Sequence, residues 1–121
     1  MDVHILIAED YPGLRDALRL LLECEGYVVS TAADGQDALD AALRLQPDVL
    51  VTDIEMPRMS GCELRLRLLE AGMSIPVLFM SADPSVRALA VEHGAEAALV
   101  KPFDPNDLLA AISRTVRRAA A

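Results

Sequence analysis

The sequence DVLVTDIEMPRMSG, residues 48–61, joins a short apolar run to a carboxylate and a turn. The run 49–52 has the length and composition of a buried β-strand, which places Asp53 at the carboxyl end of that strand. Pro57 prevents a regular continuation, and Gly61 gives the backbone freedom just before the next helical pattern. Asp53 is therefore presented on a turn, where a carboxylate can react, bind a metal ion or cap a helix.

The rest of the chain alternates short apolar strands with helical patterns. The predicted strands cover residues 3–8, 27–32, 49–52, 76–80 and 97–100. The predicted helices run from Pro12 to near Gly26, through 38–43, through 64–69, through 84–93 and from Pro105 to beyond Val116. Strict alternation with short connections predicts an α/β fold of the doubly wound type, in which helices cover both faces of a five-stranded parallel sheet.

Length and composition predict one folded domain over residues 1–121, with no output domain in this chain. Hydrophobic residues make up 53% and charged residues 25%, and no apolar run approaches the roughly 20 residues that a membrane span requires. The net charge of −8 argues against direct binding of nucleic acid. The N-terminus lacks the features of a secretory signal, and Cys24 and Cys62 are too few for a disulfide scaffold, so we expect a cytoplasmic protein.

Polar or charged side chains follow the predicted strands. They are Glu9 and Asp10 after the first, Asp34 after the second, Asp53 after the third, Ser81 after the fourth and Lys101 after the fifth. The carboxyl ends of parallel strands lie at one edge of a sheet, where ligands bind. We therefore expect the groups after the first, third, fourth and fifth strands to converge on one pocket.

The chemistry of these groups suits phosphoryl transfer. Glu9, Asp10 and Asp53 repel one another if their strands are neighbours, and Mg²⁺ is the natural compensation for clustered carboxylates. Lys101 can pair with a carboxylate or with an anion attached to it, and the Ser81 hydroxyl can donate to the same anion. Asp53 would then be the nucleophile that receives the phosphoryl group.

Each residue alone also has a purely structural explanation, as a loop acid, a helix cap, a turn residue or a surface charge. Their occurrence together at four strand ends favours a common site. With these motifs the sequence resembles the receiver domain of two-component response regulators over essentially its whole length. The resemblance rests on Glu9-Asp10, on the spacing from Asp53 through Met56-Pro57 to Gly61, on Met80-Ser81-Ala82 and on Lys101-Pro102-Phe103.

The resemblance implies a flavodoxin-like receiver fold with strand order 2-1-3-4-5. It implies that Asp53 accepts a phosphoryl group from a phosphohistidine on a sensor histidine kinase or a histidine phosphotransfer protein. Asp10, Asp53 and the backbone carbonyl of Glu55 correspond to ligands of Mg²⁺, for which Mn²⁺ can substitute, and Glu9 acts through water. Ser81 corresponds to the switch hydroxyl and Lys101 to the ion pair of the phosphoryl group, with a cis bond before Pro102.

One position departs from the family pattern. Ala98 stands three residues before Lys101, where the family often has a tyrosine or phenylalanine whose rotation accompanies activation. The usual coupling of a switch hydroxyl to a switch aromatic therefore cannot operate in its common form. Glu55 and Asp83 each lie two residues beyond a site residue, at positions that influence phosphoryl lifetime in this family.

The sequence is compatible with three functions. The leading one is a signalling domain, not a separate enzyme, that is phosphorylated on Asp53 and then acts on a downstream protein or output domain. The alternatives are a degenerate receiver that only binds proteins and, with less support, a phosphohydrolase of the haloacid dehalogenase type that uses Glu55 as a second acid. The basic cluster Arg114, Arg117 and Arg118 either stabilises the end of the last helix or forms a salt-bridged dimer face with acids of the fourth or fifth helix.

Overall fold

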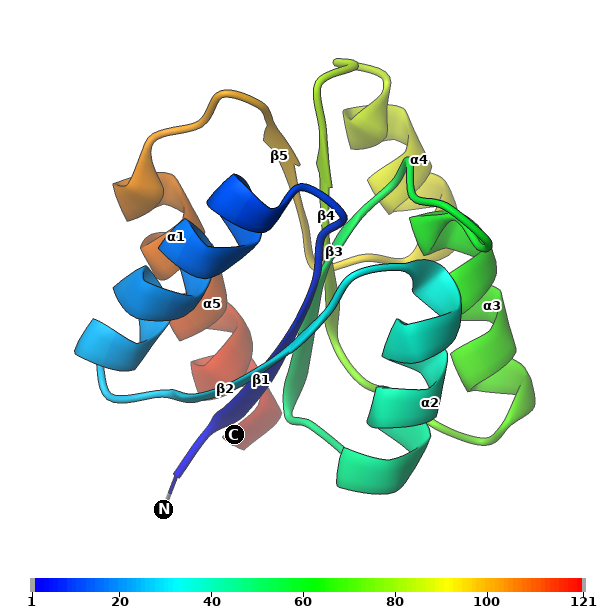
Figure 1. Ribbon diagram of the computed structural model, residues 1–121, viewed down its shortest axis with the longest axis horizontal. Helices are drawn as coiled ribbons and strands as arrows, with labels where there is room; N and C mark the ends of the chain where they lie inside the picture. Colours follow the sequence, from blue (N-terminus) through cyan, green and yellow to red (C-terminus); the bar gives the residue numbers. More distant parts are fainter. Residues whose placement is uncertain (1, 121) are drawn as a thin grey trace.

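Five parallel strands form the centre of the computed structural model, which describes residues 2–120 (Figure 1). The strands are β1 (His4–Ala8), β2 (Val28–Ala32), β3 (Val49–Asp53), β4 (Val77–Ser81) and β5 (Ala97–Val100). Their order in the sheet is β2-β1-β3-β4-β5. The doubly wound parallel sheet that the sequence predicted is thus confirmed, including the order that the family resemblance implied.

Five helices cover the two faces of this sheet. They are α1 (Pro12–Cys24), α2 (Gly35–Leu45), α3 (Gly61–Glu70), α4 (Val86–His93) and α5 (Pro105–Ala120). α1 and α5 lie on one face, and α2, α3 and α4 lie on the other (Figure 1). Across residues 2–120, none of these helices combines the length and apolarity needed to cross a membrane.

Each face of the sheet has its own hydrophobic core, because successive strand residues point to opposite sides. In β1, Ile5 and Ile7 pack with α1 and α5, whereas Leu6 packs under α2 and α3. β1 and β3 are neighbours, with Ile5 opposite Val49. Burial on both faces explains why the central strands are almost uninterrupted runs of apolar residues.

Two helices begin earlier than their apolar positions indicated. The Asp34 side chain caps α2 by accepting the backbone N–H of Asp37 at 2.8 Å. The Ser60 hydroxyl caps α3 by accepting the N–H of Glu63 at 3.1 Å. The first turns of both helices are polar, so the hydrophobic pattern revealed only their later, core-facing turns.

Asp53 and Ser81 are the last residues of their strands, one position closer to the sheet than the sequence suggested. The next backbone groups still bond across the sheet: the N–H of Ile54 donates to the Met80 carbonyl at 2.9 Å, and the N–H of Lys101 donates to the Ser81 carbonyl at 2.8 Å. The site residues are therefore fixed by strand hydrogen bonds.

Gly61 is needed for space. A Cβ atom at this position would lie 2.3 Å from the backbone carbonyl oxygen of Asp53 and 3.1 Å from its carbonyl carbon. The sequence had indicated a need for unusual backbone freedom, but no left-handed φ is found at Gly61. The absent side chain lets the start of α3 pack directly on the end of β3.

We expect Gly61→Ala to lower the free energy of unfolding by about 1–3 kcal/mol, because the new methyl group has to displace backbone. Gly13→Ala is the matched control, since its Cβ would meet chiefly the exposed Tyr11 ring, at 2.9 Å, and not backbone. Urea denaturation of both variants tests this. Equal stability of the two variants would contradict the steric role of Gly61.

Candidate functional site

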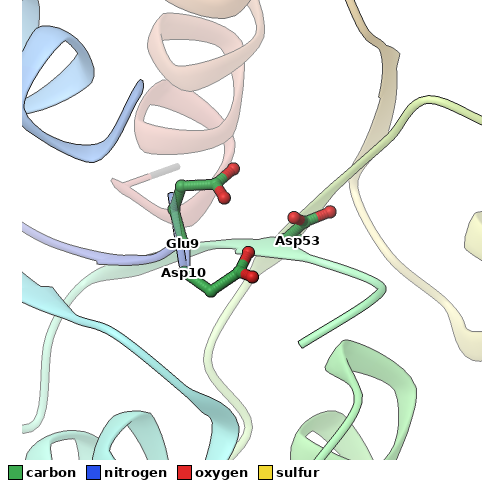
Figure 2. Close-up of side chains that lie close together, drawn as sticks. All are labelled: Glu9, Asp10 and Asp53. Atoms are coloured by element: carbon green, nitrogen blue, oxygen red, sulfur yellow. The ribbon is translucent and has the colours of Figure 1, made fainter. Parts of the chain in front are cut away.

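Three carboxylates meet at the carboxyl ends of β1 and β3 (Figure 2). One carboxylate oxygen from each of Glu9, Asp10 and Asp53 lies within 4.8 Å of the others. Glu9 and Asp53 are only 1% and 5% exposed, whereas Asp10 is open to solvent. The neighbouring strands bring these residues together as the sequence predicted.

Lys101 supplies the positive charge of the cluster. Its Nζ atom lies 2.6 Å from Oε1 of Glu9 and 2.9 Å from Oδ2 of Asp53. The backbone at this point follows the expected path, with a cis peptide bond between Lys101 and Pro102. One ammonium group thus bridges two nearly buried carboxylates that are 44 residues apart in the chain.

The cluster changes the acidity of its members. Burial is the main reason that the pKa of Asp53 rises from 3.8 to about 6, and the charge of Glu9 adds to the rise while the hydrogen bond from Lys101 opposes it. Burial lowers the pKa of Lys101, but its bonds to Glu9 and Asp53 outweigh this and hold the pKa above the usual value. Asp53 is therefore a desolvated carboxylate that a nearby cation stabilises.

Glu9 is fixed by more contacts than the sequence indicated. Its Oε2 atom accepts the backbone N–H of Tyr11 at 3.0 Å, while Oε1 accepts from Lys101. Arg15 donates from Nη1 to the Glu9 carbonyl at 3.0 Å. The family resemblance implies only that Glu9 contacts the metal ion through water. Arg15 lies on α1 outside any recognisable motif, so no sequence pattern indicated its role.

Ser81 contacts Glu55. Its Oγ atom lies 3.0 Å and 3.1 Å from the two carboxylate oxygens of Glu55, and it accepts the backbone N–H of Asp83 at 3.0 Å. The family resemblance implies that the Glu55 backbone carbonyl is a metal ligand and that the Glu55 side chain influences the lifetime of the phosphoryl group. It does not predict this hydrogen bond.

The loop between β3 and α3 is tied to the start of α2. Arg58, which has a left-handed φ of 70°, lies 3.2 Å from Asp34 and 3.8 Å from Asp37. The N–H of Gly35 points to the Pro57 carbonyl at 3.5 Å. Asp34 therefore supports the loop and caps a helix, and it is outside the carboxylate cluster.

Ala98 lies on β5 beside Phe79 of β4. It lines a surface hollow of about 380 Å³ between α4, β5 and α5, whose rim includes Arg87, Asp107 and Arg114. Ala98 is one of several small side chains that line this space. Nearby, Arg118 pairs within the chain with Glu96 at 2.7 Å, which uses one of the three arginines at the end of α5.

The arrangement has the chemistry of a site for a hard cation and a phosphoryl group. Carboxylate and carbonyl oxygens are the ligands that Mg²⁺ prefers, and the exposed carboxylate of Asp10 leaves one side of the cluster accessible. Lys101 is close enough to Asp53 to pair with an anion formed there. Glu9, Asp10, Asp53 and Lys101 lie in direct proximity, whereas the Ser81 hydroxyl, at the end of β4, bonds to Glu55.

Comparison with known proteins agrees with this geometry. The family model of the response regulator receiver domain matches residues 5–113. The response regulator MprA of Mycobacterium bovis is 39% identical over 120 residues, and MprA of Mycobacterium tuberculosis is also 39% identical. These matches cover 98% of this chain and 52% of each relative, so the chain spans about half the length of the curated relatives.

Solved structures agree as well. A response regulator receiver domain protein from Clostridium thermocellum superposes with a TM-score of 0.90 at 27% identity, over 98% of this chain and 97% of the other. The chemotaxis response regulator CheY4 of Vibrio cholerae gives a TM-score of 0.84 at 32% identity, over 95% and 99%. The chain belongs to the receiver domain family of two-component response regulators.

Proposed function

We propose that Asp53 of this receiver domain accepts a phosphoryl group from a phosphohistidine on a sensor histidine kinase or a histidine phosphotransfer protein. One observation carries the proposal: Asp53 is a nearly buried carboxylate in contact with the Lys101 ammonium, beside two further carboxylates at the same sheet edge. A carboxylate that only caps a helix needs neither burial nor contact with an ammonium group, and Ser60 already caps the helix that follows.

In the transfer step, a carboxylate oxygen of Asp53 attacks the phosphorus atom. A new O–P bond forms as the P–N bond breaks, and the electron pair of that bond goes to the imidazole nitrogen of the donor. Lys101 then pairs with the phosphoryl oxygens as well as with Asp53. Glu9 holds the ammonium group in place through its own hydrogen bond to Lys101.

Mg²⁺ is the metal that this oxygen-rich donor set fits best, with Mn²⁺ as a substitute. We propose Asp10, Asp53 and the backbone carbonyl of Glu55 as its ligands, with Glu9 contributing through water. When bound, the ion neutralises negative charge on the carboxylates and the phosphoryl oxygens. The cluster of Glu9, Asp10 and Asp53 supports this assignment.

The comparisons favour a receiver domain over a phosphohydrolase. The carboxylate cluster and the contact between Lys101 and Asp53 support a receiver that is phosphorylated over one that only binds proteins. We further propose that the domain works in the cytoplasm, which its two unpaired cysteines support. Phosphorylation would change its binding to a downstream protein or to a further domain. A dimer formed through α4 and α5 is one route for this change.

We expect incubation with Mg²⁺ and acetyl phosphate to add one phosphoryl group to the protein, because Asp53 is ionised and activated by its surroundings. Intact mass spectrometry measures the addition. Asp53→Asn should abolish it, whereas Asp34→Asn should retain it, since Asn caps a helix as well as Asp. Sustained hydrolysis of phosphate esters would favour the phosphohydrolase. If neither the parent chain nor Asp34→Asn took up a phosphoryl group, the result would favour the receiver that only binds proteins.

We also expect Asp53 to make stability depend on pH when a chelator removes divalent ions. The folded state binds the Asp53 proton more tightly than the unfolded state, because the pKa rises from 3.8 to about 6. Its contribution to stability is therefore present below about pH 4 and lost as the pH rises through 6.

Asp53→Asn lacks this titration. The variant should match the parent at about pH 4 and exceed it by about 1–3 kcal/mol at neutral pH in urea denaturation. Groups that do not interact with Asp53 cancel in the difference. A difference between the two proteins that does not change with pH would contradict the elevated pKa.

A further inference from the structure

The Ser81 hydroxyl is fully engaged in this structure. A hydroxyl group has one proton to donate, and the Ser81 proton faces the Glu55 carboxylate at 3.0–3.1 Å. The Ser81 oxygen also accepts the Asp83 N–H at 3.0 Å. The hydroxyl therefore cannot donate to a group on Asp53 without first giving up its bond to Glu55.

Glu55 lies on the solvent side of this contact. Ser81 is 1% exposed, whereas Glu55 is exposed and comes from the loop that follows Asp53. Within residues 2–120, Glu55 has no ion pair that would hold its carboxylate elsewhere. Its side chain is therefore bound to the structure mainly through Ser81, and it can leave into solvent.

A phosphoryl group on Asp53 would disfavour this contact. The ionised Asp53 carboxylate carries one negative charge, whereas a phosphoryl group there carries about −1.5 to −2. The charge near the Glu55 carboxylate therefore becomes more negative by about 0.5 to 1, and like charges repel. Burial is the chief cause of the raised pKa of Asp53, but the charge of Glu55 also contributes, so the two carboxylates already interact. Phosphorylation thus creates both a repulsion on Glu55 and a new acceptor for Ser81.

We propose that Glu55 is a latch, a positioning residue whose carboxylate holds the Ser81 hydroxyl in the unphosphorylated protein and releases it when Asp53 carries a phosphoryl group. The proposal rests on the proposed function of Asp53 and adds a role for the Glu55 side chain. It is separate from metal binding, because the Glu55 carbonyl belongs to the backbone and remains when the side chain is removed.

The latch lowers the affinity for a phosphoryl mimic, because binding has to break the bond between Ser81 and Glu55. We expect Glu55→Ala to bind beryllofluoride about two- to tenfold more tightly at saturating Mg²⁺, as follows from the loss of one part-buried hydrogen bond. Amide NMR titration measures the dissociation constants. Weaker or unchanged binding would overturn the latch.

A double-mutant cycle separates the latch from simple repulsion. If Glu55 acts through Ser81, the gain from Glu55→Ala vanishes in a Ser81→Ala background. If Glu55 only repels the bound anion, the same gain persists in that background and the latch is overturned. Asp83→Asn is the charge-matched control, since its side chain accepts the Ser85 N–H and does not contact the Ser81 hydroxyl.

A second measurement needs no phosphoryl group. Three-bond couplings should report one χ1 rotamer for Ser81 in the unmodified protein and the same rotamer in Asp83→Asn. In Glu55→Ala they should report changed rotamer populations, because only the Asp83 N–H still binds Oγ. An unchanged Ser81 rotamer in Glu55→Ala would overturn the latch. Failure of the unmodified protein to take up beryllofluoride or a phosphoryl group would instead overturn the proposed function, and the rotamer measurement would still decide the latch.

Discussion

The arrangement of the strands in this structure depends on a cluster of three carboxylates and one ammonium group at a single edge of the sheet. Glu9 and Asp53 are nearly buried, and Lys101 contacts both at 2.6 Å and 2.9 Å. A buried charge without a partner is costly, so Lys101, which follows β5, has to lie close to the ends of β1 and β3. The parallel sheet, with β1 next to β3, meets this requirement through the backbone alone.

Close backbone packing holds the loop that carries the site. A Cβ atom on Gly35 would lie 2.2 Å from the Met59 carbonyl oxygen, and one on Gly61 would lie 2.3 Å from the carbonyl oxygen of Asp53. The first residues of α2 and α3 therefore rest directly on this loop. Arg58 adds an ion pair to Asp34, the residue that caps α2. The position of Asp53 thus depends on two helix starts as well as on its strand.

The sequence predicted the alternating elements, the parallel sheet and the four strand ends that carry the site. These features follow from local periodicity and from the rule that parallel strands share one edge. The strand order came from the family resemblance, because periodicity carries no information on neighbours. The bond between Ser81 and Glu55 joins residues 26 apart and depends on the path of a loop, so no pattern predicted it. The sequence shows that Ala98 departs from the family pattern of an aromatic residue, but only the structure reveals the hollow beside it.

The loop after β3 also has a mechanical consequence. One end is clamped where the N–H of Ile54 bonds to Met80 and the N–H of Gly61 returns to the Ile54 carbonyl. The other end is clamped where Arg58 meets Asp34. Between them, in the described chain, residues 55–56 make no backbone hydrogen bond. Glu55 therefore lies on a short span between two anchored points, and its exposed side chain can turn outward without displacing the sheet, the helices or the lysine bridge.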